Sequence, residues 1–224
     1  MVTIEWFGHS YIRITGEKGP SIVIDPHDGG SLNLPEFRVH GDIVLVTHDH
    51  YDHNAVEMIQ GAKLVLSQFR GSKRLENTII QGYKTYHDKT KGKLRGENTV
   101  YIVKINNIKI AHLGDIGHKP SDRLLEALRD VHVLMIPVGG VYTIDAYEAW
   151  EIVEETQAKI VLPLHFWVPH STTPLDPLGK FLNIAKAGRT RLDTNKLSIS
   201  TQGLQNIKRT VVVMPDPYSF HEAQ

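Results

Sequence analysis

The segment from Thr47 to His53 constrains this chain more than any other part of it. It reads Thr-His-Asp-His-Tyr-Asp-His and directly follows the apolar run from Ile43 to Val46. A short apolar run of this kind is typical of a buried strand, so three imidazoles and two carboxylates are expected where a strand ends. Imidazole and carboxylate groups are the ligands of zinc and related divalent metals. The segment therefore predicts a metal site.

The spacing within this segment indicates how the side chains face the site. Side chains alternate along an extended backbone, so His48, His50 and Asp52 can face one cavity if the chain stays extended past the strand. A turn between Asp52 and His53 would direct that pair at a second point in the same cavity. Two adjacent metals are therefore expected.

A surface loop that happens to be rich in His and Asp is the alternative explanation, because polar residues commonly collect at strand ends. That explanation requires the shared parity, the buried strand and the helix signal that follows to coincide by accident. We therefore favour the metal site.

Composition limits the kinds of site that the chain can build. Its 224 residues are 41% hydrophobic, which is enough to bury a sizeable core, and we expect one domain over residues 1–224. There is no cysteine, so disulfides and thiolate ligands are excluded. Any metal must be held by His, Asp or Glu, which suits zinc, manganese, iron or nickel.

Net charge and hydropathy indicate the expected cellular location and the classes of partner that are not favoured. Lys plus Arg equals Asp plus Glu at 25 each, so net charge does not favour nucleic acid or an anionic membrane as a partner. No signal-peptide pattern opens the chain, and the longest apolar run, around 131–141, is too short to span a bilayer. A soluble, cytoplasmic protein is expected.

Two further candidate residues lie near the start of the chain. Two predicted strands flank Gly8-His9-Ser10, which places His9 at the tip of a tight turn. His9 is a candidate catalytic residue that could stabilise charge or protonate a leaving group if the turn reaches the metals. Asp25 ends a predicted strand and could accept the second N–H of a motif histidine. A cap beside Pro26 is the alternative role for Asp25.

Three later strand ends carry more candidates. His87 and His165 each follow a predicted strand, and Asp115 lies between two glycines that let the backbone come close. The two oxygens of Asp115 could bridge two metals. For His165 the alternative is a rigid turn between two prolines. His112 and His118, on either side of Asp115, are open as supporting or surface residues.

Periodicity, turn residues and caps predict the remaining elements. Helices are expected from residue 54 by a capping box, over 68–75, from 121, over 145–156 by a second capping box, and over 177–188. Strands are expected at 2–7, 11–14, 21–25, 43–46, 63–66, 78–81, 83–87, 99–105, 108–113, 131–137, 159–162, 196–200 and 210–213.

Two loops are candidates for substrate contacts. The loop 88–96 carries four basic residues, which is typical either of a solvated turn or of an electropositive lip that attracts a phosphorylated or carboxylate substrate. Tyr142 and Thr143 lie on a glycine-led loop after a strand and could contact substrate, with plain packing as the alternative.

Taken together, these residues resemble the metallo-β-lactamase fold superfamily, whose pattern is His-x-His-x-Asp-His followed by a His, a bridging Asp and a final His. In this chain the pattern reads His48, His50, Asp52, His53, His87, Asp115 and His165. The match runs from the first strand to Trp167. The segments 6–10, 24–26, 112–115 and 137–143 are similar to the branch of metal-dependent hydrolases related to the ascorbate-6-phosphate lactonases.

The resemblance implies an α/β (α+β) fold, a four-layered αββα sandwich with the site at one edge of its two sheets. It also implies two metal sites: His48, His50 and His87 in the first, Asp52, His53 and His165 in the second, and Asp115 shared. The major zinc β-lactamases carry a cysteine in the second site. Because this chain has none, antibiotic hydrolysis is not expected.

The expected chemistry is hydrolysis by two divalent ions, with zinc the first choice and manganese, nickel or iron as alternatives. Two such ions can share a water and lower its pKa to about 7. The bridging hydroxide would attack an ester, lactone or phosphodiester. Asp52 and Asp115 are candidates to orient it, and His9 to assist the leaving group.

Other functions are open at this stage. A phosphodiesterase or nuclease acting on nucleic acid would need a larger basic surface or an added domain. A flavin-linked diiron enzyme of this fold carries Glu at the position of His50, and a non-catalytic metal-binding protein would keep the site without turnover. The expected partner is a small-molecule substrate, anionic as one option, with no membrane partner and with a homo-oligomer open.

Overall fold

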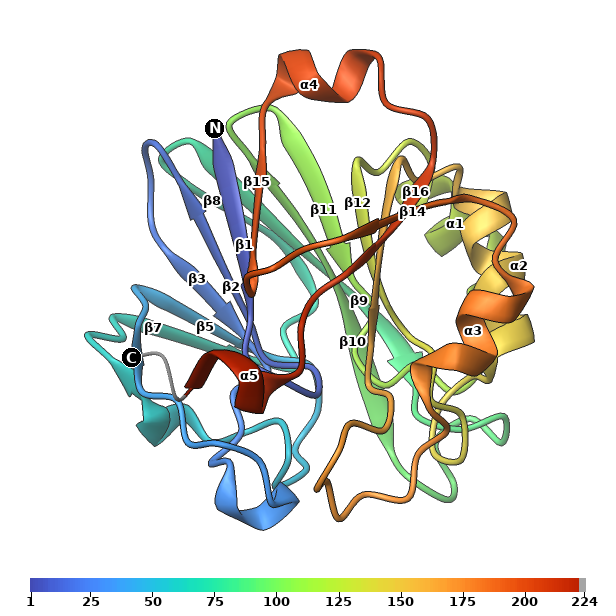
Figure 1. Cartoon of the computed structure of the whole chain (residues 1–224). Helices are drawn as coiled ribbons and strands as arrows, with labels where there is room; N and C mark the ends of the chain where they lie inside the picture. Colours follow the sequence, from blue (N-terminus) through green and yellow to red (C-terminus); the bar gives the residue numbers. More distant parts are fainter. Residues whose placement is uncertain (222–224) are drawn as a thin grey trace.

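The computed structural model describes residues 1–221, in which two mixed β-sheets pack face to face and are flanked by helices (Figure 1). The first sheet has six strands in the order β15-β1-β2-β3-β5-β7. In chain order its strands are β1 Val2–Trp6, β2 Ile12–Gly16, β3 Ile22–Ile24, β5 Ile43–Val46, β7 Leu64–Ser67 and β15 Lys196–Ile199. The expected metallo-β-lactamase type of fold is confirmed.

The second sheet has eight strands in the order β14-β16-β13-β12-β11-β10-β9-β8. In chain order these are β8 Gly71–Leu75, β9 Thr78–Tyr86, β10 Glu97–Ile105, β11 Ile108–His112, β12 Val133–Pro137, β13 Ile160–Leu164, β14 Gly188–Arg191 and β16 Thr210–Val213. β12 and β13 are buried along their whole length, as expected of parallel strands that are covered on both faces.

Three helices lie together on the outer side of the eight-stranded sheet (Figure 1). They are α1 Asp122–Leu128, α2 Ala146–Thr156 and α3 Leu178–Ile184. The predicted capping box of α2 is present: Asp145 accepts the backbone N–H of Glu148, and the Glu148 side chain accepts that of Asp145. Because both ends of this reciprocal pair are satisfied, the helix begins where its sequence indicates.

Shorter elements lie around the six-stranded sheet, on its outer face and at its ends. They include the 3₁₀ helices η1 Gly30–Leu32 and η2 Val56–Met58, the two-stranded sheet of β4 Val39–His40 and β6 Ile59–Gln60, and α5 Pro217–His221; a further helix, α4 Thr201–Gln205, follows β15. A second hydrophobic cluster joins Phe37, Met58 and Ile59 to Val23 and Val44 of the sheet. The larger core lies between the two sheets and under α1 to α3.

The strand directions bring the functional loops to one end of the sandwich. Antiparallel and parallel pairings in turn make β1, β3 and β5 run the same way in the first sheet, and β9, β11, β12 and β13 run the same way in the second. Carboxyl ends of strands that run in one direction meet at one edge of a sheet. The loops that follow these strands carry His9, Asp25, the segment 48–53, His87, Asp115 and His165.

Two predicted helices are wrong. Residues 68–75 contain β8, which pairs antiparallel with β9 as the edge of the eight-stranded sheet. The segment after residue 54 forms only η2, and Asn54 donates to Asp49 at 2.6 Å instead of capping a helix. In both places a pairing with a distant segment satisfies the backbone, which overrides a weak local helix preference.

One predicted strand break and one helix end are also wrong. β9 runs unbroken from Thr78 to Tyr86 through Gly82. Gly82 marks a close approach: a Cβ there would lie 1.9 Å from the carbonyl oxygen of Phe69. α3 ends at Ile184, before the predicted 188, because the chain then enters β14 beside β16.

Candidate metal centre

The Asp115 side chain lies at the centre of a buried cluster of histidines. Its Oδ2 atom is 3.0 Å from Nε2 of His165, 3.1 Å from Nε2 of His87, 3.4 Å from Nε2 of His53 and 3.9 Å from Nε2 of His48. These five residues come from loops that follow four different strands. Four imidazole nitrogens that converge on one carboxylate oxygen form a ready set of nitrogen and oxygen donors.

The candidate ligands form two groups, and Asp115 joins them through a third group with His48 and His53. Ligand atoms of His48, His50 and His87 lie within 4.8 Å of one another, and so do those of His9, Asp52, His53 and His165. The first group is the set that the resemblance implied for one metal. The second contains the set implied for the other metal, with His9 added.

The predicted geometry of the central motif needs one correction. The chain does not stay extended to Asp52, because a turn closed by the backbone hydrogen bond from His53 to the His50 carbonyl (2.9 Å) spans residues 50–53. His48 and His50 still belong to one group, and Asp52 and His53 to the other. The turn starts at His50, earlier than predicted, and its last residue, His53, contacts the Asp25 carboxylate through Nδ1.

Asp25 anchors two histidines of the motif at once. Its carboxylate is fully buried and accepts the backbone N–H of Thr47 at 2.8 Å, the Thr47 hydroxyl at 2.7 Å and Nδ1 of His53 at 3.0 Å. The Thr47 oxygen is in turn 2.9 Å from Nδ1 of His48. The predicted contact of Asp25 with a motif histidine is confirmed. Because Nδ1 of both rings is engaged, their Nε2 atoms are left facing the cluster.

His87 and Asp115 are held by similar contacts to other loops. Nδ1 of His87 donates to the carbonyl oxygen of Tyr142 (3.1 Å), which directs Nε2 inward. The backbone N–H of Asp115 donates to Oδ1 of Asn98 at 3.0 Å. A Cβ at Gly117 would lie 2.4 Å from the His87 backbone, so only glycine lets these two loops approach so closely.

Charges within the cluster shift the ionisation of its members. Burial by itself disfavours the charged form of His53, but the carboxylates of Asp115, Asp52 and Asp25 outweigh it and raise its pKa well above 6.5. Burial likewise opposes ionisation of Asp115, yet the adjacent His165 and His53 hold its pKa well below the ordinary value. Burial and the charge of His53 lower the pKa of His48. In the metal-free protein a proton on His53 thus balances buried carboxylates.

His9 is the remaining member of the second group. Its Nε2 is 3.1 Å from Oδ2 of Asp52. Burial and the neighbouring His165 lower its pKa to about 4, so the ring is neutral at pH 7. Burial alone would raise the pKa of Asp52, but His53 and the hydrogen bond with His9 outweigh it and lower that pKa. An ionised carboxylate can only accept, so His9 donates to Asp52.

Several other residues fall outside the cluster. His112 is buried; its Nε2 is 3.0 Å from the Ser10 carbonyl oxygen and its Nδ1 accepts from Gly114. His118 accepts the backbone N–H of Tyr86. The Thr143 hydroxyl donates to a carbonyl oxygen of the next residue. None of the three belongs to a candidate metal group among residues 1–221.

Sequence reasoning did not find Thr47 or Asn98 as supporting residues. Thr47 precedes the motif, and a hydroxyl that links two polar side chains has no sequence signature. Asn98 lies near the start of β10 and fixes both Asp115 and the Leu113 carbonyl oxygen. Only the folded chain places it against residues 15 to 17 positions away.

The residues present fit a pair of divalent cations. Within the described chain, His48 Nε2, His53 Nε2 and Asp115 Oδ1 are buried and have no hydrogen-bond partner. Buried polar atoms without partners are costly, and bound ions are one accepted reason for them. The donors are imidazole and carboxylate only, which suits zinc and related metals.

A hollow of about 350 Å³ opens above the cluster. Five of the predicted ligands form its floor: His50, Asp52, His87, Asp115 and His165. Its rim consists of Tyr51, Leu94, Arg95, Tyr142 and the segment 172–174. Its volume lies in the range of small-molecule sites.

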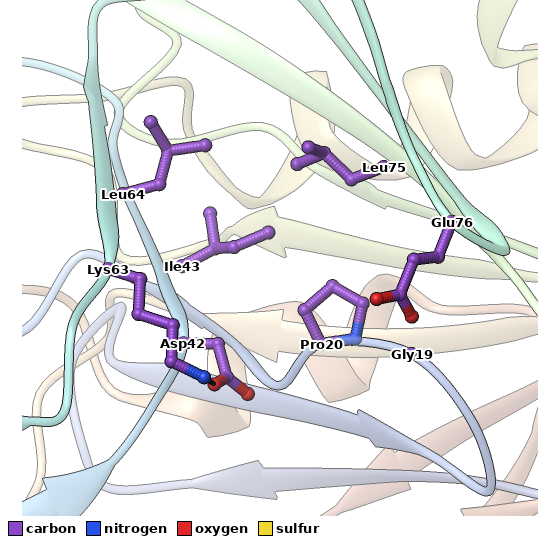
Figure 2. A pocket seen from close by; sticks show the side chains of 8 residues that line it. All are labelled: Gly19, Pro20, Asp42, Ile43, Lys63, Leu64, Leu75 and Glu76. Carbon is purple, nitrogen blue, oxygen red and sulfur yellow. Dashed lines mark hydrogen bonds and ion pairs between the residues drawn. The ribbon is translucent and has the colours of Figure 1, made fainter.

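A second hollow, of about 390 Å³, lies at the opposite end of β5 and β7, where those strands begin (Figure 2). Three charged residues line it: Asp42 and Lys63, which pair with each other at 2.7 Å, and Glu76. No candidate metal group of residues 1–221 lies there. The histidine cluster is therefore the candidate functional site, although this other hollow is slightly larger.

Comparison with known proteins places the chain in a family. Residues 3–165 match the Beta-lactamase superfamily domain. A UPF0173 metal-dependent hydrolase of Thermococcus onnurineus is 30% identical over 203 residues, which cover 78% of this chain and 89% of that protein. The chain belongs to the UPF0173 metal-dependent hydrolases of the metallo-beta-lactamase superfamily. It is thus a metal-dependent hydrolase.

Other relatives agree with this membership. The UPF0173 metal-dependent hydrolase of Pyrococcus horikoshii is 29% identical over 203 residues, or 78% of this chain and 89% of that one. A crystal structure from Thermotoga maritima, provisionally assigned as a Zn-dependent hydrolase of the metallo-beta-lactamase superfamily, has a TM-score of 0.75 and 28% identity, covering 96% of this chain and 99% of that chain. Igni18 from Ignicoccus hospitalis, a metallo hydrolase, shares the fold at a TM-score of 0.66 and 20% identity over 96% of each chain.

Across residues 1–221, no helix combines the length and the apolar character that a bilayer crossing requires.

Proposed function

We propose that this hydrolase binds two divalent cations, zinc first among them, and cleaves an ester, lactone or phosphodiester bond of a small molecule. The convergence of four imidazole Nε2 atoms on Oδ2 of Asp115 carries the proposal. His48, His50 and His87 would hold one cation, Asp52, His53 and His165 the other, and Asp115 both. Such a pair supplies a water of pKa about 7 and polarises the carbonyl or phosphoryl oxygen.

Residues around the candidate metal ligands hold their side chains in position. Asp25 and the Tyr142 carbonyl oxygen fix the rings of His53 and His87, so that little reorganisation is needed at the reacting centre. His9 donates to Asp52 and holds that carboxylate in place. His9 does not line the hollow, and the single N–H of its neutral ring is used by Asp52, so we assign it to positioning this carboxylate.

The hollow favours a small molecule over a polymer. Its volume is about 350 Å³, and the chain as a whole carries no net charge. A lactone is the first substrate type to try, because the sequence resembles the ascorbate-6-phosphate lactonases. Phosphodiesters are the second.

Elemental analysis and a substrate screen test the proposal together. Purified protein should hold close to two equivalents of divalent metal, and metal-free protein reloaded with zinc, manganese, nickel or iron should hydrolyse at least one member of a panel of lactones, esters, thioesters and phosphodiesters. His87→Ala should lose about one equivalent of metal and reduce kcat/KM at least 100-fold. His118→Ala, a histidine of the same face outside the cluster, should change neither.

Two results would contradict the proposal. One is a reloaded wild-type protein that binds two metals and cleaves nothing in the panel, which would favour a non-catalytic metal-binding protein. The other is a His87→Ala variant that keeps full metal content and activity.

A further inference from the structure

Among residues 1–221, Arg95 is the one Lys or Arg side chain on the rim of the hollow above the metal centre. The loop 88–96 contains four basic residues, but only Arg95 among them lines the hollow. Lys89 points elsewhere and pairs with Glu148, while Lys91 and Lys93 are exposed. The positive charge of this loop therefore reaches the site through one side chain.

The backbone of the loop is organised so that Arg95 has a defined position. Asp88, the residue after His87, accepts backbone N–H groups from Thr90, Gly92, Leu94 and Arg95, and also the Thr90 hydroxyl. One buried carboxylate thus closes the whole loop. A side chain on such a rigid loop loses less conformational entropy when it binds a ligand.

The Arg95 guanidinium is also positioned by an aromatic ring. It stacks over Tyr142 with 5.1 Å between its central carbon and the ring centroid. The carbonyl oxygen of this same Tyr142 accepts the hydrogen bond that orients His87. Arg95 is therefore connected to His87 both through Asp88 along the chain and through Tyr142 across the hollow. A guanidinium over an aromatic ring can still donate its N–H groups to an anion.

Arg95 has no carboxylate partner within the described chain. None of the ion pairs in residues 1–221 involves its guanidinium, whereas the surface cations Lys84 and Arg70 both pair with Glu97. The two carboxylates that line the hollow, Asp52 and Asp115, belong to the metal centre. A guanidinium that is held in place but unpaired beside a reaction site suits a carboxylate or phosphate, which it binds through two parallel hydrogen bonds.

The neighbouring rim residues are suited to contact an apolar portion of such a ligand. Leu94 is 74% exposed and Tyr51 is 63% exposed, and both line the hollow. Exposed apolar side chains around a site contribute contact area for an apolar group. The rim thus combines one fixed cation with apolar surface.

We propose that Arg95 determines substrate specificity by binding a carboxylate or phosphate group that the substrate carries apart from the bond that is cleaved. This inference rests on the proposed hydrolase function and narrows its substrate class to small molecules with an anionic group and an apolar portion.

The test compares two esters of equal chain length, 4-nitrophenyl butyrate, which is neutral, and mono-4-nitrophenyl succinate, which carries a carboxylate. On zinc-loaded protein, Arg95→Ala should raise KM for the succinate ester 10- to 100-fold with kcat within threefold, and leave KM for the butyrate ester within threefold. Arg95→Lys should recover part of the loss, because an ammonium binds without the paired geometry. Lys93→Ala, from the same loop, should leave both esters within twofold.

A binding measurement separates this inference from the proposed function. Calorimetric titration of metal-free protein with inorganic phosphate should show at least tenfold weaker binding for Arg95→Ala and no change for Lys93→Ala. Loss of phosphate binding with no hydrolysis of either ester would keep the role of Arg95 and reject the ester-hydrolase function. Equal phosphate binding by wild type and Arg95→Ala, or an equal effect of the substitution on both esters, would overturn the role of Arg95.

Discussion

Replacing Asp25 with Asn tests whether buried support outside the metal ligands sets metal affinity. Oδ2 of Asp25 accepts from both the Thr47 hydroxyl and Nδ1 of His53, and Oδ1 accepts the Thr47 backbone N–H. An Asn of the same shape can keep the backbone contact, but its NH₂ group would face two donors. This conflict between donors is removed if Nδ1 of His53 accepts a hydrogen bond from the Asn NH₂ group. The neutral His53 ring then carries its proton on Nε2, the atom that lies 3.4 Å from Oδ2 of Asp115. A protonated Nε2 cannot bind a metal.

The magnitude follows from these contacts. Loss of a supporting partner behind a metal-bound histidine costs about 10- to 100-fold in metal affinity, which is roughly 1.4–2.7 kcal/mol. Hydrogen bonds to a charged group contribute about 1.5–3 kcal/mol each, so we expect the metal-free variant to lose about 2–4 kcal/mol of its free energy of unfolding. Removal of the charge also takes away one cause of the raised pKa of His53.

The assay is zinc competition with a chromophoric chelator, together with urea unfolding of the metal-free protein. Asp42→Asn is the matched control, since Asp42 likewise accepts a backbone N–H and a hydroxyl, both from Ser21, at 2.9 and 2.7 Å. That residue lies beside the hollow in Figure 2, at the other end of β5. The control should lose stability and keep zinc affinity. Zinc affinity of a folded Asp25→Asn protein within threefold of wild type would refute the proposed support.

Two further substitutions test the fold around the site. Burial and the nearby His9 lower the pKa of His27 from 6.5 to about 3, so between these pH values the unfolded chain binds a proton that the folded chain does not, and stability falls as pH falls. When the pH is lowered from 7.5 to 5, the free energy of unfolding of metal-free His27→Gln, measured with urea, should fall by about 2 kcal/mol less than that of wild type. Equal losses would contradict the buried neutral state of His27. Gly82→Ala would place a Cβ 1.9 Å from the Phe69 carbonyl oxygen and should lower the free energy of unfolding by more than about 2 kcal/mol. The control Gly30→Ala, with nothing within 4 Å of its Cβ, should change the free energy of unfolding by no more than about 0.5 kcal/mol. Equal effects of the two substitutions would show that the loop at Phe69 is not held against β9.

Local patterns in the sequence were sufficient for the parts of this protein that short-range physics controls. The capping box at Asp145 and the strand at 210–213 are predicted and present, and the predicted strands 99–105 and 108–113 form β10 and β11, joined by a turn at Asn106-Asn107. Both turn asparagines have positive φ, of 48° and 63°, as a two-residue type I′ hairpin turn requires. Such features depend on residues a few positions apart, so their signals can be read along the chain.

The motif of His and Asp residues could also be read from the sequence, because each candidate ligand follows a strand that ends at the same edge of its sheet. Apart from the contact of Asp25 with a motif histidine, the sequence did not reveal the contacts that orient those ligands. Asp25 with Thr47, Asn98 with Asp115, and Tyr142 with His87 join residues 17 to 55 positions apart. Hydrogen bonds of this kind exist only once both sheets have assembled.

The sequence by itself thus determined which side chains could bind metals and the class of fold that gathers them. The tertiary structure decided how the rings are oriented, that residues 71–75 pair as a strand, and that Arg95 alone of four basic neighbours lines the hollow. The physical reason is that ligand identity is a property of single residues, whereas orientation and pairing depend on the surroundings that distant parts of the chain provide.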